Sequence, residues 1–366
     1  MPAIQIKTAG KTSTIITCPS IREVFRLIEG RPVVIITDQN LDRSYGDLFP
    51  EFPKIVLSNG ESSKSLETVR QIYEQLGTAE VDRDYTILGI GGGVVCDIAG
   101  FVASTYLRGL DFGFVATSLL AQVDASIGGK NGVNFAGVKN IIGTINQPRF
   151  VLCPLDVLET LPRAQFINGT AEIIKTGAIG DADLLEMLAT QQAQFINLVP
   201  DVTEQIIFRT LNFKAGIVMR DEREQGERRK LNFGHTIGHA IEIASGILHG
   251  QAVAIGMNIA AEISVRLGLL AHTEKERLEK ILTAYELPTT TSVPANELLP
   301  LIFKDKKRQG EHLRFVALKK LGSAEVINLS FNQIKEFLDD LCRLGRTQFP
   351  GNNGHFKNRR NDRNPD

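Results

Sequence analysis

The sequence is poor in cysteine and close to electrically neutral, and both features narrow the class of protein. It has four cysteines in 366 residues, and no two of them form a CxxC pair. This pattern argues against a disulfide framework or a thiolate zinc site and favours a reducing compartment. The formal net charge is −1, so no overall field attracts the chain to nucleic acid or to an anionic membrane. Any anion binding must therefore come from local sites.

Long hydrophobic runs and a targeting segment are also missing. The most apolar long stretch, residues 252–270, contains Glu262 and Arg266 and is interpreted as a buried helix. The N-terminus has no apolar core followed by a small-residue cleavage site. We therefore expect a cytoplasmic protein without membrane spans. Its length suits two domains better than one core.

The first 150 residues alternate β-branched runs with a helical pattern. Buried strands are predicted at Val33–Thr37, Ile55–Ser58 and Tyr85–Ile90, with weaker candidates at Phe112–Ala116 and Phe150–Leu152. Apolar positions at helical spacing predict a helix at Ser65–Leu76 between two of these strands. This β-α-β pattern predicts a Rossmann-like parallel sheet, which binds ligands at the carboxyl ends of its strands.

From about Leu161 the pattern changes to long helical segments. Helices are predicted at Ala171–Ile179, Asp183–Ile196, Val202–Met219, His235–Ala244, Ala252–Leu267, Glu274–Leu287 and Asn332–Leu344, with β-like runs at Leu313–Leu318 and Ala324–Leu329. We therefore expect an α/β N-terminal domain at 1–160 and a mostly α-helical domain at 161–344. The tail at 345–366 is rich in Asn, Arg, Gly and Pro and is expected to be disordered.

A glycine-rich turn follows the third predicted strand, in Gly89-Ile-Gly-Gly-Gly-Val-Val-Cys-Asp97. Glycines at a strand-to-helix turn let the backbone approach a pyrophosphate, and the helix N-terminus offers free N–H donors. The spacing is not GxGxxG, and Asp97 is too close to be the usual ribose ligand. A tight turn that only packs against the sheet remains the alternative.

Cations and amides are spread among glycines between residues 105 and 147. Such groups on glycine-bounded loops suit phosphate and carboxylate recognition, because loops can converge on one anion. The alternative is a set of solvated loop charges. The candidates are Arg108, Asp124, Lys130, Lys139 and Asn140.

Three of the six histidines fall within fifteen residues, at His235, His239 and His249. The first two are four residues apart and lie on one face of a predicted helix. The segment between them supplies no glutamate, so this is not HExxH. Two imidazoles and one carboxylate, for which Glu172 is the candidate, would leave an open position on zinc for a substrate. Buried or capping histidines are the alternative.

A series of motifs in register resembles the 3-dehydroquinate synthase family. They are GGGVVCDIAGF, STYLRG, LLAQVDASIGGK, GVKNIIG, GTAEIIKTG, NFGHTIGHAIE, LHGQAVAIGM and KDKKRQG, and the match runs from about Thr37 to about Leu329. The resemblance implies an NAD-binding α/β domain followed by a helical domain that holds a divalent metal, zinc or alternatively cobalt. It also implies a homodimer. The implied reaction converts a heptulosonate phosphate to dehydroquinate and phosphate, in the shikimate route to aromatic compounds.

The resemblance also assigns roles to single residues. It implies Glu172, His235 and His249 as metal ligands, with His239 facing the substrate instead. The other residues implied around the substrate are Arg108, Asp124, Lys130, Asn140, Lys175, Arg228, Asn232, Lys306 and Lys307. The implied NAD contacts are Asp38, Asn40, Asn59, Gly60, Glu61, Lys64, Gly93, Val94, Val95, Cys96, Asp97, Thr117, Ser118, Lys130, Lys139, Val157, Leu158, Glu159 and Thr160.

The chain departs from the family pattern at a few positions. Cys96 and Asn131 stand where we expect Gly and Thr, and Gln251 replaces the glutamate of the usual HGEA. A carboxylate two residues after a ligand histidine could support the metal shell, and an amide would do so more weakly. Three other interpretations remain: a cyclase acting on another sugar phosphate, a metal-dependent polyol dehydrogenase, and a non-catalytic binding or regulatory protein.

Overall fold

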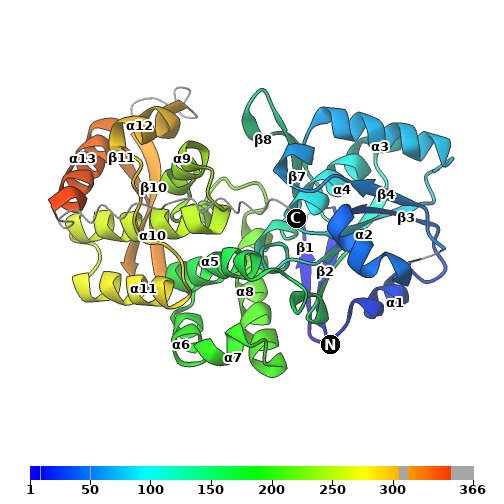
Figure 1. The fold of residues 1–366 in the computed structure, drawn as a ribbon, viewed down its shortest axis with the longest axis horizontal. Coiled ribbons are helices and arrows are strands. Elements are labelled where there is room, and N and C mark those ends of the chain that lie inside the picture. Colours follow the sequence, from blue (N-terminus) through cyan, green and yellow to red (C-terminus); the bar gives the residue numbers. More distant parts are fainter. Residues whose placement is uncertain (9, 50, 305–311, 348–366) are drawn as a thin grey trace, which may run out of the picture.

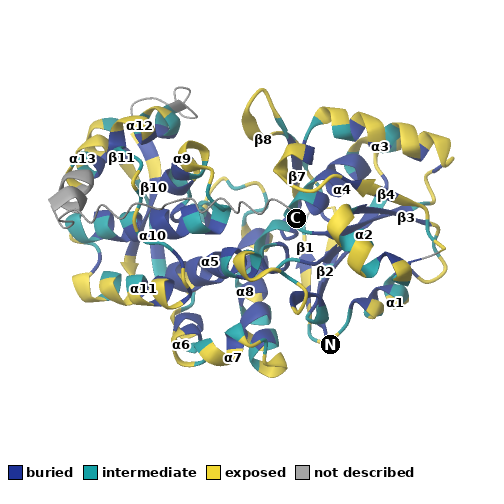
Figure 2. Ribbon diagram, viewed as in Figure 1, coloured by how far each residue is buried: buried dark blue, intermediate teal, exposed yellow. Residues whose placement is uncertain are grey.

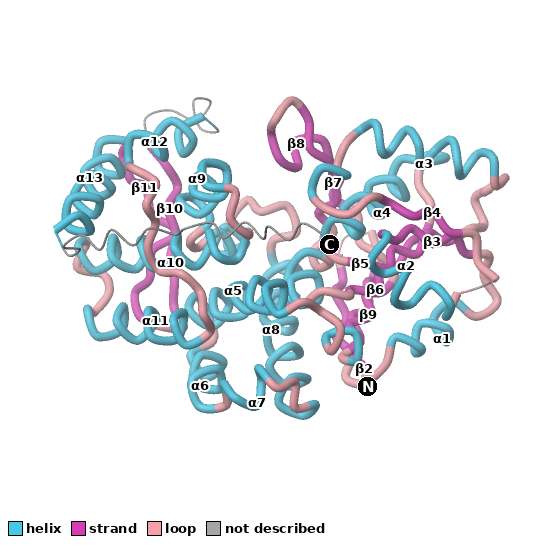
Figure 3. Tube along the Cα trace, in the orientation of Figure 1, coloured by secondary structure: helices cyan, strands magenta, loops and turns pink. Residues whose placement is uncertain are grey.

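The computed structural model describes residues 1–8, 10–49, 51–304 and 312–347 (Figure 1). Lys306 and Lys307 therefore lie outside the described residues, as does the predicted tail from residue 348 onward. The described chain forms two halves, one built around a sheet and the other mainly helical (Figure 3).

A seven-stranded sheet in the order β1-β2-β9-β6-β5-β3-β4 organises the N-terminal half. The strands that confirm the prediction are β3 (Val33–Asp38), β4 (Lys54–Leu57), β5 (Thr86–Gly91), β6 (Asp111–Ala116) and β9 (Phe150–Pro154). These five strands run parallel to one another. Every residue of β5 and β9 is buried, as expected for a parallel sheet covered on both faces (Figure 2).

Two strand pairs were not predicted from the sequence. β1 (Ala3–Lys7) pairs antiparallel with β2 (Thr12–Cys18), which joins the sheet beside β9. β7 (Lys130–Phe135) and β8 (Val138–Ile145) form an antiparallel hairpin, so the interpretation of this stretch as loops was wrong. Asn131 anchors the base of the hairpin, because its buried amide donates to the carbonyl oxygens of Gly129 (2.9 Å) and Asn146 (3.0 Å).

Helices cover the sheet. They are α1 (Val24–Ile28), α2 (Gln39–Tyr45), α3 (Leu66–Thr78) and α4 (Gly93–Thr105). α3 confirms the predicted helix, and Ser65 caps it by accepting from the Thr68 N–H. α4 follows the glycine-rich turn and lies close to the sheet, since a Cβ added to Gly89 would meet the Ala99 Cβ at 2.9 Å.

The second half is mainly helical, as predicted. It contains α5 (Arg163–Gly180), α6 (Ala182–Thr190), α7 (Gln192–Ile196), α8 (Pro200–Arg220), α9 (His235–Ser245), α10 (His249–Arg266), α11 (His272–Ala284), α12 (Ala295–Lys304), β10 (His312–Lys320), β11 (Ser323–Ser330) and α13 (Phe331–Thr347). In the described part of the chain, no helix combines the length and apolar character needed to cross a bilayer.

Some helix boundaries differ from the prediction. The helix predicted at Asp183–Ile196 is split at Gln191, whose φ of −114° and ψ of 23° leave the helical region. α12 was not predicted, because Pro300 inside it is a helix-breaking signal. α13 continues to Thr347, so residues 345–347 are helical and not part of a disordered tail.

Candidate functional site

A buried carboxylate and two histidines meet where three helices of the C-terminal half converge. Glu172 of α5 is 1% exposed, and its Oε1 lies 3.5 Å from the Nε2 atoms of both His235 and His249. His235 begins α9 and His249 begins α10. The ligand atoms of these three residues lie within 4.8 Å of one another, so they could hold one metal ion.

Glycines bring these three helices together backbone to backbone. A Cβ on Gly256 of α10 would lie 2.0 Å from the Gly234 carbonyl oxygen, just before α9. A Cβ on Gly250 would lie 2.0 Å from the Asn168 carbonyl oxygen of α5, whose Oδ1 accepts from the Gly250 N–H at 2.5 Å. Any larger side chain at either glycine would therefore separate the elements that carry the cluster.

The residues of the cluster fit a metal cation. Both carboxylate oxygens of Glu172 are buried, and neither has a hydrogen-bond partner among the described residues, although Lys175 Nζ forms an ion pair with Oε2. Burial would raise the pKa of Glu172, but the charge of Lys175 holds it well below its usual range. Burial and Lys175 lower the pKa of His235 to about 3, so its ring is neutral and can ligate. Lys175 compensates the charge at Oε2, whereas Oε1 faces the two imidazole nitrogens, where a metal cation could bind.

His239 lies next to this cluster, with its ring centroid 5.1 Å from that of His235. It is exposed, whereas Glu172 is buried. His239, Glu242 and His249 form a second group with ligand atoms within 4.8 Å. The two groups share His249, and only the first contains a buried carboxylate without hydrogen bonds.

A buried charge network adjoins the metal cluster. Asp124 Oδ1 lies 3.9 Å from Lys175 Nζ and 2.5 Å from Lys214 Nζ. Burial would raise the pKa of Asp124, but Lys214 and Lys175 lower it, so the carboxylate is ionised. The pKa of Lys214 falls to about 8 because of burial, which Asp124 only partly offsets. Because Lys175 also pairs with Glu172, two buried lysines and two buried carboxylates share this desolvated space.

Lys214 was not among the predicted site residues. It lies in the middle of α8 with its side chain 8% exposed. Its position in the sequence could have indicated burial, because it is three to four residues from Thr210, Leu211 and Val218, which lie on the same buried helix face. A lysine at such a position is rarely buried without a partner.

Three further predicted substrate residues, Arg228, Lys130 and Asn232, contact the protein itself. The Arg228 side chain is buried, and its Nη2 donates to the Gly128 carbonyl oxygen at 3.0 Å. Lys130 and Asn232 both contact the carboxylate of Glu224, another residue that the prediction missed. Glu224 has φ +58°, which is rare for a residue other than glycine.

Arg108 is the exception among these residues. It is exposed, has φ +67° and forms no ion pair with any described residue. It lies beyond the C-terminal end of α4, whereas the glycine-rich turn lies at the N-terminal end. Thirteen helical residues separate the two by about 20 Å. Arg108 therefore lies far from the glycine-rich turn at the other end of α4.

The predicted NAD residues gather at the carboxyl ends of the parallel strands. Asp38 ends β3, and its Oδ1 caps α2 by accepting from the N–H groups of Asn40 (2.9 Å) and Leu41 (3.0 Å). Asn59, Gly60 and Glu61 follow β4, Gly93 through Asp97 follow β5, Thr117 and Ser118 follow β6, and Val157 through Thr160 follow β9. This is the edge at which doubly wound sheets bind nucleotides.

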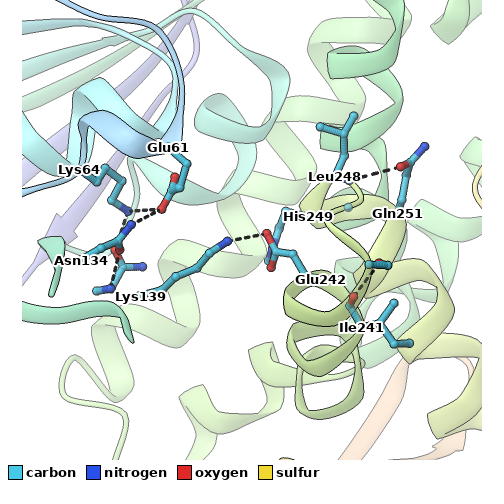
Figure 4. A network of polar contacts seen from close by, with 12 residues as sticks. Glu61, Lys64, Asn134, Lys139, Ile241, Glu242, Leu248, His249 and Gln251 are labelled. Atoms are coloured by element: carbon cyan, nitrogen blue, oxygen red, sulfur yellow. Dashed lines mark hydrogen bonds and ion pairs between the residues drawn. The ribbon is translucent and has the colours of Figure 1, made fainter. Parts of the chain in front are cut away.

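Lys64 joins this strand edge to the β7–β8 hairpin. Its Nζ donates to Asp97 Oδ2 and to Asn140 Oδ1, each at 2.5 Å, and its side chain is 5% exposed. Burial raises the pKa of Asp97 to about 6, against the opposing charge of Lys64. Asn140, a predicted substrate residue, thus lies among the predicted NAD residues. Lys139 contacts Glu242 of α9 instead, with Nζ to Oε1 at 2.8 Å (Figure 4).

The fold resembles solved structures that contain a nucleotide and a metal. It matches the 2-epi-5-epi-valiolone synthase ValA of Streptomyces hygroscopicus with NAD+ and Zn2+ bound, at a TM-score of 0.83, with 25% identity over 90% of this chain and 96% of that chain. It also matches 2-deoxy-scyllo-inosose synthase complexed with carbaglucose-6-phosphate, NAD+ and Co2+, at a TM-score of 0.82, with 24% identity over 93% of this chain and 100% of that chain. The fold and the Glu–His cluster define the class as a sugar phosphate cyclase fold with a candidate metal site.

Sequence comparisons identify the family. Residues 54–168 match the family model described as 3-dehydroquinate synthase N-terminal, and residues 169–308 match the one described as 3-dehydroquinate synthase C-terminal. The 3-dehydroquinate synthase of Dehalococcoides mccartyi strain BAV1 is 44% identical over 80% of this chain and 84% of its own length. That of Acidithiobacillus ferrooxidans is 41% identical over 81% of this chain and 84% of its own length. The chain belongs to the 3-dehydroquinate synthase family.

Proposed function

We propose that this chain is a 3-dehydroquinate synthase of the shikimate pathway, with NAD and a divalent metal, zinc or cobalt, as cofactors. The reaction converts 3-deoxy-D-arabino-heptulosonate 7-phosphate to 3-dehydroquinate and phosphate. Family membership over most of the chain supports the reaction. The observation that carries the metal proposal is the buried Glu172 carboxylate, whose Oε2 pairs with Lys175 and whose Oε1 faces two histidine nitrogens.

Glu172, His235 and His249 would hold the metal. A divalent metal there supplies a Lewis acid that polarises a substrate hydroxyl or carbonyl oxygen. His235 contributes a neutral Nε2, because its Nδ1 contacts the Phe233 carbonyl oxygen at 3.1 Å. Lys175 keeps Glu172 ionised, so the carboxylate does not have to lose a proton when the ligand set assembles.

Lys175, Lys214 and Arg228 would hold the anionic groups of the substrate. All three are buried around Asp124, where an anion is attracted more strongly than in water. His239 is exposed beside the metal cluster and would face the substrate. Because helices α5, α8 and α9 fix Lys175, Lys214 and His239, these three residues would keep the reacting carbons aligned through several chemical steps.

NAD would lie along the carboxyl ends of the parallel strands, where it supplies a hydride acceptor that is regenerated in each turnover. The free N–H groups at the start of α4 would bind its pyrophosphate, after the glycine-rich turn. Asp38, which ends β3, would face the ribose from the neighbouring strand. Because the turnover returns the hydride, no NADH should accumulate.

We further propose that the chain acts in the cytoplasm as a homodimer, with an α/β domain at 1–160 and a helical domain at 161–344. Family resemblance supports the dimer and the compartment, and the position of the sheet supports the division. Light scattering of the purified protein tests the dimer directly. A mass of about twice 40.2 kDa is expected, and a mass of 40.2 kDa would exclude it.

The direct test measures phosphate release from the heptulosonate phosphate with catalytic NAD and zinc, with and without a chelator. We expect equal amounts of phosphate and dehydroquinate, no accumulating NADH and loss of activity on chelation. Lack of phosphate release by metal-loaded protein would contradict the proposal. Net NADH production from a simple polyol would instead indicate a metal-dependent polyol dehydrogenase.

A further inference from the structure

Glu242 of α9 lies beside the metal cluster and is not part of the proposed ligand set. Its side chain is 12% exposed, and each of its carboxylate oxygens has a partner. Oε2 lies 3.3 Å from His249 Nδ1. Oε1 lies 2.8 Å from Lys139 Nζ, a contact that Figure 4 shows. A mostly buried carboxylate held at both oxygens has a fixed orientation.

The contact to Glu242 determines which nitrogen His249 can offer to a metal. When Nδ1 carries the proton and donates to Glu242, the lone pair belongs to Nε2, which points toward Glu172 at 3.5 Å. His235 shows the same arrangement, since its Nδ1 contacts the Phe233 carbonyl oxygen and its Nε2 faces Glu172. In each histidine, Nδ1 thus contacts a hydrogen-bond acceptor and Nε2 faces Glu172.

We propose that Glu242 is a positioning residue of the metal site, which fixes the tautomer and ring orientation of His249 and is itself held by Lys139 from the β7–β8 hairpin. The inference rests on the proposed metal site of Glu172, His235 and His249. Acceptors behind metal-ligating histidines raise the basicity of the ring and limit its rotation, and their removal typically weakens metal binding by about 10–100-fold.

Position 251 does not provide this support. Its side chain turns toward the backbone, where Gln251 Oε1 accepts from the Leu248 N–H at 3.3 Å at the start of α10. The structure therefore does not support a role for residue 251 in the metal shell. The supporting carboxylate comes from α9, and Gln251 caps α10, so the loss of a carboxylate at position 251 leaves His249 with an acceptor.

Lys139 extends the network from the helical half to the sheet half. It lies in β8, and its ion pair with Glu242 crosses between the two halves (Figure 4). The Lys139 side chain is 45% exposed, so solvent weakens this ion pair. We therefore expect a small effect of Lys139 on metal affinity, below about five-fold, through the orientation of Glu242.

The test is zinc affinity, measured on metal-depleted full-length protein by competition with a chromophoric chelator. The variants are Glu242→Ala, Glu242→Gln, Lys139→Met and His235→Ala. Glu276→Gln is the matched control, because Glu276 also pairs with a histidine, His272, at 3.4 Å but on the exposed face of α11. Circular dichroism and thermal melting verify that each variant is folded, and Glu242→Gln keeps the volume of the side chain if Glu242→Ala does not fold.

We expect Glu242→Ala to weaken zinc binding by about 10–100-fold, Glu242→Gln by less, and Glu276→Gln not at all. Wild-type affinity in both Glu242 variants would overturn the inference and leave the proposed function intact. Abolished binding in Glu242→Ala with retained binding in His235→Ala would make Glu242 a ligand, and would overturn it as well. Failure of the wild-type protein to bind zinc would overturn the proposed metal site itself.

Discussion

The metal cluster and the strand edge differ in how far their polar groups are satisfied by the protein itself. At the strand edge, Asp38 caps α2, and Asn59 Nδ2 donates to Asn40 Oδ1 at 3.2 Å. In the metal cluster, both oxygens of Glu172 are buried and neither has a hydrogen bond among the described residues. Polar side chains at the strand edge are thus paired within the chain, whereas Glu172 Oε1 faces two imidazole nitrogens, where a metal cation could bind.

This difference predicts that substitutions in the cluster affect function far more than substitutions at the strand edge. The largest effect is expected for Glu172→Gln. The substitution removes the only carboxylate of the proposed ligand set, and we expect phosphate release to fall by at least about 10³-fold, since the Lewis acid contributes several kcal/mol. Steady-state phosphate release and zinc content by mass spectrometry are the measurements.

Glu186→Gln is the control for Glu172→Gln, because Glu186 is 58% exposed and pairs with Arg277 on the surface. It should retain wild-type activity and zinc content. Activity of Glu172→Gln within ten-fold of wild type would contradict the proposal that Glu172 is a ligand of a catalytic metal.

Lys214→Met should have the next largest effect. The substitution removes a buried cation from the network around Asp124, and we expect kcat/KM for the substrate to fall by about 10²-fold, the scale of one desolvated charge-assisted contact of 1.5–3 kcal/mol. Lys319→Met, at a lysine that is 55% exposed and pairs with Glu325, is the control. Equal kcat/KM in the two variants would mean that Lys214 has only a structural role.

Gly256→Ala tests the close packing that assembles the cluster. The new Cβ would lie 2.0 Å from the Gly234 carbonyl oxygen, so we expect the free energy of unfolding to fall by about 1–3 kcal/mol. Gly77→Ala is the matched control on α3, where an added Cβ meets nothing within 4 Å. It should stabilise the protein by about 0.5–1 kcal/mol in chemical denaturation. A stable Gly256→Ala variant with full zinc affinity would show that α9 and α10 need no such contact.

The smallest effect is expected at the strand edge, for Asp38→Ala. Loss of the cap of α2 should reduce the free energy of unfolding by about 1 kcal/mol, measured by urea denaturation. Asp38→Asn keeps an oxygen acceptor and should retain wild-type stability. If both variants are as stable as wild type but bind NAD weakly, Asp38 serves the cofactor and not the helix.

The sequence alone predicted the parallel strands well, because their signal is local. Runs such as Val33–Thr37 are rich in β-branched residues and buried on both faces of the sheet. Such continuous runs are typical of parallel strands that are covered by helices on both sides. β1 and β2 were missed because their alternating pattern is short, and because β2 is held in place by β9, more than 130 residues further along the chain. Pairing over such a distance leaves no local signal.

The site was predicted in part. The histidines were visible from spacing, and Glu172 was the candidate carboxylate although it lies more than sixty residues earlier. Only the family resemblance selected His235 and His249, and not His239, as its partners. Lys214 and Glu242 were missed, because charged residues in helices usually belong to the solvated face. Lys139 was predicted to contact NAD, and the structure places it against Glu242, across the two halves of the chain.

The central claim is that one divalent metal binds Glu172, His235 and His249, with Glu242 behind His249. Anomalous diffraction at the zinc absorption edge, from crystals of the zinc-loaded protein, tests it most directly. We expect one peak within bonding distance, about 2.0–2.2 Å, of Glu172, His235 Nε2 and His249 Nε2. A peak between His239, Glu242 and His249, with Glu172 unligated, would contradict it.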